Sequence, residues 1–149
     1  PSKVIGRLVQ AKQAADLHTS IFVQMVAYDI CQRGFLRQHV KRIRDTYKER
    51  CAVMISAMEK FFPPEAKWTR PQGGLFLWVR LPDGVDSMGL LQAALEQKVA
   101  FIPGSAFYAD GAGGRNTLRL TFSTARPEMI EEGIKRLGKA IKAQLDELR

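Results

Sequence analysis

The hydrophobic period of the sequence changes at one point, the proline pair Pro63–Pro64. Before the pair, apolar residues recur at steps of three and four, which places them on one side of a helix. These residues are Leu36, Val40, Ile43, Tyr47, Cys51, Met54, Met58 and Phe61. After the pair, segment 75–81 alternates every two residues, as a strand with one buried face does. Because proline interrupts a helix, we expect one long helix over residues 35–60, followed by a domain with a sheet.

Further elements are predicted downstream of this strand. A short helix capped by Asp86 or Ser87 comes first and extends to about Gln97, followed by a short strand at 100–102. Segment 117–123 alternates strictly, and Pro127 occupies the first turn of a final helix. The buried stripe of that helix would contain Ile130, Ile134, Leu137, Ile141, Leu145 and Leu148. The order strand, helix, strand, strand, helix is typical of an α/β fold of the α+β two-layer sandwich type, in which helices cover one face of a small sheet.

The first thirty-four residues are predicted to form two helices. Ser2 is suited to cap the first helix, and Thr19 or Ser20 the second. Gly34 is suited to end the second helix. We therefore place a domain boundary near Phe35.

Length and composition exclude several classes of protein. A chain of 149 residues with 46% hydrophobic and 26% charged residues can bury a core. Its apolar stretches are far shorter than the roughly 20 residues of a membrane helix, and no secretory signal pattern opens the chain. We expect a cytoplasmic location and no membrane partner. The chain begins at Pro1, within a helical pattern and without an initiating methionine, which favours a fragment of a longer protein.

The net charge of +8 comes mainly from the first sixty residues. Their basic cluster consists of Arg37, Lys41, Arg42, Arg44, Lys48 and Arg50. A basic stripe is one footprint of nucleic-acid binding. Here Asp45 and Glu49 interrupt it, and most of it runs beside the apolar stripe of the long helix, where a solvated flank would lie. We expect no nucleic-acid partner, and salt-dependent retention on DNA would test the alternative.

Several candidate catalytic groups lack the spacing that their chemistry needs. His18 and His39 have no partners at metal-ligand spacing, so we expect no metal. Ser105 lacks the GxSxG context of a nucleophile and is interpreted as a turn hydroxyl. The glycine run 111–114 precedes a strand and so lacks the helix dipole that binds phosphate. We interpret it as a flexible loop.

Arg119 lies in the middle of a predicted strand, on a face that it shares with Thr117, Thr121 and Ser123. Its planar guanidinium offers paired donors that match a carboxylate. The spacing alone leaves two interpretations open, a carboxylate-binding residue and a surface arginine on a strand.

Three ordered blocks carry a resemblance to a known family. They are PQGGLFLWVRLP at 71–82, VAFIPGSAF at 99–107 and NTLRLTFS at 116–123. They resemble the C-terminal part of class I pyridoxal-phosphate aminotransferases of fold type I, and the 2-aminoadipate and kynurenine aminotransferase branch most of all. Residues 8–19 and 39–50 resemble the same branch, so the likeness covers essentially the whole chain.

The resemblance implies roles for parts of this chain. Arg119 matches the family's arginine that binds the substrate α-carboxylate. Pro71, Gly73 and Gly74 match a strand start that folds over the active-site mouth. Residues 1–34 resemble the end of the large cofactor-binding domain. Residues 35–149 resemble the small C-terminal domain, with the long connecting helix at 35–60.

The resemblance also implies what this chain lacks. The family's Schiff-base lysine stands in the context Ser-x-Ser/Thr-Lys-x-x-x-Pro-Gly-x-Arg, and Ser2-Lys3, the nearest approach, does not continue that pattern. We expect the lysine and most residues that bind pyridoxal 5'-phosphate to lie upstream, so that the chain has no catalytic residue and is inactive alone. The full-length protein would transfer an amino group from an α-amino acid to a 2-oxo acid as a homodimer. The alternative is a regulator that fuses a winged-helix DNA-binding module to an aminotransferase-like domain.

Overall fold

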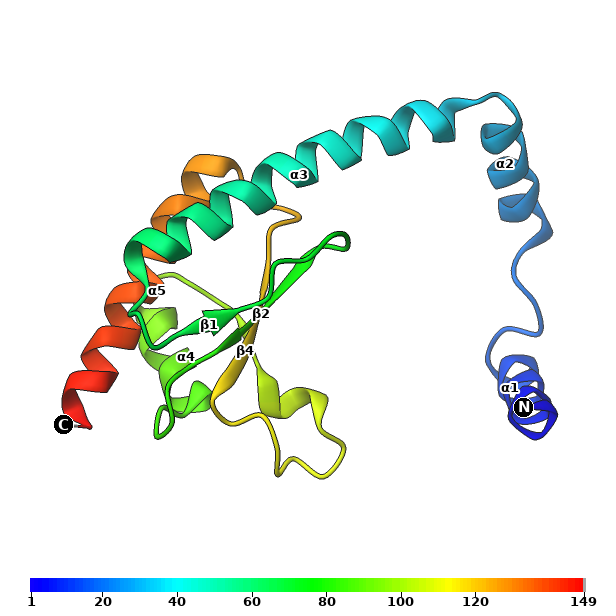
Figure 1. Cartoon of the computed structure of the whole chain (residues 1–149). Coiled ribbons are helices and arrows are strands. Elements are labelled where there is room, and N and C mark those ends of the chain that lie inside the picture. Colours follow the sequence, from blue (N-terminus) through cyan, green and yellow to red (C-terminus); the bar gives the residue numbers. More distant parts are fainter. Residues whose placement is uncertain (149) are drawn as a thin grey trace. The chain divides into compact units, whose positions relative to one another are not determined.

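The computed structural model describes residues 1–148 (Figure 1). Two compact units divide the chain, one covering residues 1–43 and the other beginning at Arg44, and each is described separately. The helices are α1 (Ser2–Ala15), α2 (Ile21–Gln32), α3 (Phe35–Phe61), α4 (Ser87–Glu96) and α5 (Pro127–Glu147), and a short 3-10 helix spans Gly104–Phe107. The strands are β1 (Lys67–Trp68), β2 (Phe76–Arg80), β3 (Ile102–Pro103) and β4 (Thr117–Thr121). None of the described helices is both long and apolar enough to cross a bilayer.

The first unit contains α1, α2 and the beginning of α3, which confirms the two predicted helices. The predicted capping role of Ser2 is wrong, because α1 begins at this residue and Pro1 is its N-cap. Ser20 is the N-cap of α2, although its hydroxyl makes no capping hydrogen bond. Gly34 follows α2 with a φ of +77°, a conformation that glycine adopts without strain. Every residue of α1 and α2 is exposed, so this unit has no core of its own.

The second unit contains a four-stranded antiparallel sheet with the order β1-β2-β4-β3. Strands β2 and β4 confirm the two predicted alternating segments, and Trp78 pairs with Arg119 across them. The predicted strand at 100–102 is displaced, because Ile102 and Pro103 make the pairing with β4. Strand β1 was not predicted, since two residues are too few to show a period.

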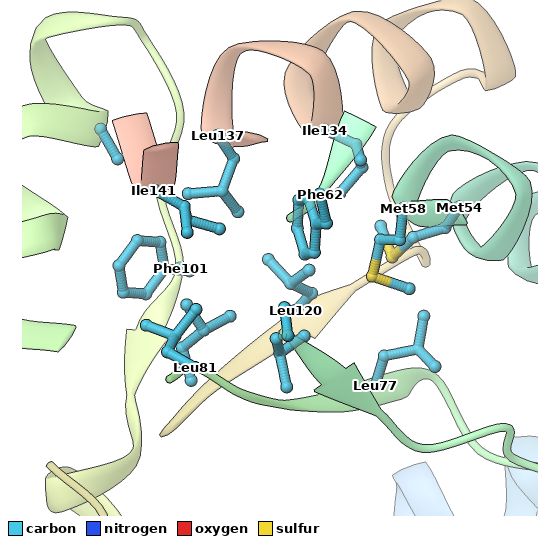
Figure 2. Packing of buried hydrophobic residues seen from close by; sticks show 14 of the residues in the cluster. Met54, Met58, Phe62, Leu77, Leu81, Phe101, Leu120, Ile134, Leu137 and Ile141 are labelled. Atoms are coloured by element: carbon cyan, nitrogen blue, oxygen red, sulfur yellow. The ribbon is translucent and has the colours of Figure 1, made fainter. Parts of the chain in front are cut away.

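Three helices cover one face of this sheet, which confirms the predicted two-layer α/β sandwich. Alternate residues of the central strands, such as Leu77 and Leu120, point into the core (Figure 2). The helices contribute Met54 and Met58 from α3, Leu90 and Ala94 from α4, and Ile134, Leu137 and Ile141 from α5. The pleat sends the intervening residues of β2 and β4 to the opposite face of the sheet.

At one end of each long helix, residues of the predicted buried stripe are exposed. On α3, Leu36 and Val40 stay exposed, and partial burial begins at Ile43, the last residue of the first unit. On α5, Leu148 lies beyond the last helical residue and is exposed. Pro127 stands at the start of α5, as predicted.

Candidate functional site

Arg119 lies at the centre of β4, on the sheet face that the helices leave uncovered. It is half-buried, and its guanidinium lies over two aromatic rings. The guanidinium carbon is 4.1 Å from the ring centroid of Phe76 and 4.6 Å from that of Phe107. Trp78, the cross-strand partner of Arg119, meets the Phe107 ring edge to face at a centroid distance of 5.4 Å. Arg119 thus lies beside three aromatic residues, Phe76, Trp78 and Phe107, which we call the aromatic platform.

The guanidinium of Arg119 has free hydrogen-bonding capacity. No residue within 1–148 forms a hydrogen bond or ion pair with it. Other arginines do find acidic partners, for example Arg136 with Glu132 at 2.8 Å. Stacking on a ring uses the face of the guanidinium and leaves its N–H edge available. A half-buried cation in this state is suited to an external anion, and its fork geometry favours a carboxylate.

The segment between β3 and β4, which carries Phe107, is closely packed around Tyr108. Tyr108 packs against the backbone of Gly113, where an added Cβ would lie 2.3 Å from the ring. An added Cβ at Gly114 would lie 2.6 Å from the same ring. The hydroxyl of Thr117 closes the loop by donating to the carbonyl of Gly114 at 2.8 Å. The glycine run interpreted as a flexible loop is therefore closely packed at its second half.

The hydroxyl groups predicted to lie beside Arg119 are engaged locally. Thr121 Oγ1 donates to the carbonyl of Leu75 at 3.1 Å and lies 3.0 Å from Ser123 Oγ. Arg50, which belongs to the basic cluster on α3, donates to the carbonyl of Ser123. These bonds attach the end of β4 both to the segment before β2 and to α3.

The predicted active-site mouth lies in the turn between β1 and β2. Gly73 and Gly74 are exposed in this turn, and no atom outside their immediate neighbours would contact an added Cβ. Gly74 has a φ of +84°, which explains the choice of glycine there. The turn leads directly into Phe76 and so borders the aromatic platform. Its role at a mouth stays a prediction.

The remaining candidate groups do not assemble into a reactive site. His18 and His39 are exposed, and the described residues contain no cluster of three or more His, Cys, Asp or Glu side chains that could hold a metal. Ser105 is half-buried in the 3-10 helix. Cys31 is exposed, whereas burial raises the pKa of the Cys51 thiol and so disfavours the reactive thiolate.

The lysines and the glycine run are the groups of this chain that a phosphate-bearing cofactor would be expected to contact. Every lysine of the chain is exposed, including Lys3 in α1. The glycine run packs on Tyr108 instead of opening a helix toward a phosphate group.

Comparisons with known sequences show the family to which this chain belongs. Residues 2–137 match the family model described as aminotransferase class I and II, so the chain belongs to this family. The 2-aminoadipate transaminase of Thermus thermophilus is 45% identical over 143 residues, which cover 96% of this chain and 36% of that protein. The chain thus spans about a third of the length of the curated relatives it matches.

Solved structures show the same fold. The crystal structure of LysN, the alpha-aminoadipate aminotransferase of Thermus thermophilus complexed with N-(5'-phosphopyridoxyl)-L-leucine, aligns with a TM-score of 0.87 and 44% identity, covering 97% of this chain and 37% of that one. The kynurenine aminotransferase of Pyrococcus horikoshii aligns with a TM-score of 0.86 and 44% identity, covering 99% and 35%. An uncharacterised HTH-type transcriptional regulator of Bacillus subtilis is 34% identical over 142 residues, covering 95% of this chain and 29% of that protein.

The three aromatic residues around Arg119 were not identified from the sequence. A signal existed for two of them, because Phe76 and Trp78 alternate with the buried Leu77 and must therefore share the uncovered face. No comparable signal existed for Phe107, whose position depends on how the loop before β4 folds.

Proposed function

We propose that this chain is part of a pyridoxal-phosphate-dependent aminotransferase, which transfers an amino group from an α-amino acid to a 2-oxo acid. Within it, Arg119 binds the α-carboxylate of the substrate. The observation that carries this proposal is the half-buried guanidinium without an ion pair to any of residues 1–148, held on two aromatic rings. The covalent chemistry of such enzymes belongs to the cofactor, which residues outside this chain would hold.

Arg119 would act by binding and orienting the substrate. Two parallel N–H donors of the guanidinium match the two oxygens of a carboxylate, so a single contact fixes both the position and the plane of that group. Fixing the carboxylate limits the rotation of the attached α-carbon, which is catalysis by positioning. The surrounding aromatic side chains reduce the contact with water and strengthen the pairing.

The same proposal assigns the parts of the chain. Residues 1–34 would close the large cofactor-binding domain, and residues 35–149 would form the small domain with α3 as its connecting helix. The full-length protein would be a cytoplasmic homodimer. Because no lysine of this chain stands in the family's Schiff-base context, we expect the 149-residue chain to be inactive alone.

The test of this proposal is substitution of Arg119 in the full-length protein. Arg119→Ala would leave the substrate carboxylate unpaired, which costs about 2–5 kcal/mol in binding. We expect kcat/KM to fall by about 30-fold to several thousand-fold. Arg119→Lys keeps the charge but loses the planar fork, so it should restore only part of the activity. Steady-state kinetics with an amino acid and a 2-oxo acid measure both effects.

A matched control is Arg80→Ala, which removes an exposed arginine from the end of the neighbouring strand β2. Its kcat/KM should stay within about two-fold of wild type, since surface substitutions change little. Both Arg119 variants should still bind pyridoxal phosphate, because we expect its ligands elsewhere in the protein. Near-normal kcat/KM in Arg119→Ala would return Arg119 to the role of a surface strand arginine.

A second function is kept open by the regulator among the relatives, an HTH-type protein that also matches nearly the whole chain. Such a protein would use the aminotransferase-like domain as a sensor. The reading frame upstream of Pro1 distinguishes the two functions. A basic helix-turn-helix pattern ahead of the cofactor domain would indicate the regulator, and a short aminotransferase N-terminus would indicate the enzyme.

A further inference from the structure

We propose that Phe76 and Phe107 are positioning residues that hold the guanidinium of Arg119 in the orientation in which it receives a carboxylate. We call these two residues the aromatic clamp. The inference rests on the proposed function and deepens it, because it names the groups that pre-orient the binding arginine. It concerns the free enzyme, before any substrate is bound.

Both rings of the clamp lie close to the guanidinium of Arg119. The two ring centroids lie 4.1 Å and 4.6 Å from the guanidinium carbon, well within the roughly 6 Å over which a cation is attracted to a ring face. No hydrogen bond or ion pair from residues 1–148 fixes the group in any other way. An arginine side chain has several rotatable bonds, and ordering them during binding weakens affinity. Rings that order the side chain beforehand remove part of that cost.

The two rings are themselves fixed by separate parts of the fold. Phe76 lies at the start of β2, where its backbone pairs with Thr121 of β4. Phe107 ends the 3-10 helix and meets the Trp78 ring at an interplanar angle of 69°. Tyr108, the next residue, packs on the glycine run. The clamp is therefore built from strand β2 and the 3-10 helix, which meet through the contact between Trp78 and Phe107.

The exposure of the clamp also fits a role at a binding site. Each phenylalanine is 46% exposed, so a ligand could reach both rings. The two rings are exposed, and none of residues 1–148 forms an ion pair with Arg119. The N–H edge of its guanidinium is therefore accessible to an anion.

The experiment replaces each ring in the full-length enzyme by leucine, which keeps apolar bulk and removes the ring face. We expect Phe76→Leu and Phe107→Leu each to raise the KM for the amino acid by about 3- to 30-fold, with a smaller change in kcat. Phe76→Tyr and Phe107→Tyr keep the ring and should recover most of the affinity. Phe61→Leu is the matched control, because Lys60 lies over the Phe61 ring at 4.9 Å on a different part of the molecule. Its KM should be unchanged.

A double-mutant cycle separates positioning from other roles. If the rings act through Arg119, then adding Phe76→Leu to Arg119→Ala should cause less than about a two-fold further loss in kcat/KM. A full multiplicative loss in the double variant, or an unchanged KM in both leucine variants, would overturn the clamp. Those outcomes leave the proposed function intact as long as Arg119→Ala alone is strongly impaired. A normal Arg119→Ala enzyme would instead contradict the proposed function itself.

Discussion

At the scale of single residues, the absence of a Cβ at Gly138 allows helices α3 and α5 to approach each other closely. Gly138 is buried on α5, and an added Cβ would lie 2.6 Å from the backbone carbonyl oxygen of Phe61, at the end of α3. A backbone atom cannot rotate away as a flexible side chain can. The ion pair between Lys60 and Glu131, at 3.4 Å, also joins these two helices. Close contact of α3 and α5 therefore depends on glycine at this position.

We predict that Gly138→Ala lowers the free energy of unfolding by about 1–3 kcal/mol, the usual cost of forcing extra volume into a packed core. This loss should exceed the gain of about 1 kcal/mol that alanine brings to a helix interior. Gly133→Ala is the matched control on the same helix, because no atom lies within 4 Å of its added Cβ. It should leave stability unchanged or raise it by up to about 1 kcal/mol. Urea unfolding midpoints at constant slope measure both, and equal effects would contradict the close contact.

The role of a single residue could be predicted only where its side chain was unusual at that place in the sequence. Arg119 stood out because a cation in the middle of an apolar strand requires a reason. Phe76 and Phe107 did not stand out, because aromatic residues in strands and turns are common. Their role depends on contacts with a residue 43 and 12 positions further along the chain, respectively, which no local pattern contains.

At the scale of elements, the sequence predicted long periodic segments correctly and missed the short ones. The long helix α3 and the alternating strands β2 and β4 were predictable, because each repeats its period at least twice. Strand β1 and the 3-10 helix were not, since two and four residues leave too little pattern. Strand β3 was displaced because pairing with β4, and not local hydrophobicity, decides which residues form it.

The N-terminus of α4 provides a test at this scale. Asp86 is its N-cap, and Oδ2 accepts a hydrogen bond from the backbone N–H of Gly89 at 3.3 Å. We predict that Asp86→Ala lowers the free energy of unfolding by about 0.5–2 kcal/mol, because a backbone donor of the first turn loses its partner. Asp86→Asn keeps an oxygen acceptor and should cost less than about 0.5 kcal/mol. If thermal unfolding gave the two variants the same stability, the side chain would not be acting as a cap.

At the scale of the whole molecule, the two units differ in what they bury. The core residues all lie between Met54 and Ile141, within the second unit. In the first unit, large apolar side chains such as Leu8 and Phe22 are 58% and 75% exposed. Surfaces of this kind mark contacts with other parts of a protein or with other molecules. Under the proposed function, their partners belong to the large domain.

We predict that the 149-residue chain self-associates through the first unit, because its two helices expose large apolar side chains. Light scattering after size-exclusion chromatography should show an average mass that rises with concentration. The matched comparison is a chain that begins at Arg44, which retains the core residues and should remain monomeric over the same range. Replacing Phe22 and Met25 by serine in the full chain should reduce association without changing the unfolding midpoint of the second unit. A strictly monomeric 149-residue chain whose first thirty-four residues resist proteolysis would contradict the prediction, because those helix faces would then be satisfied within the chain itself.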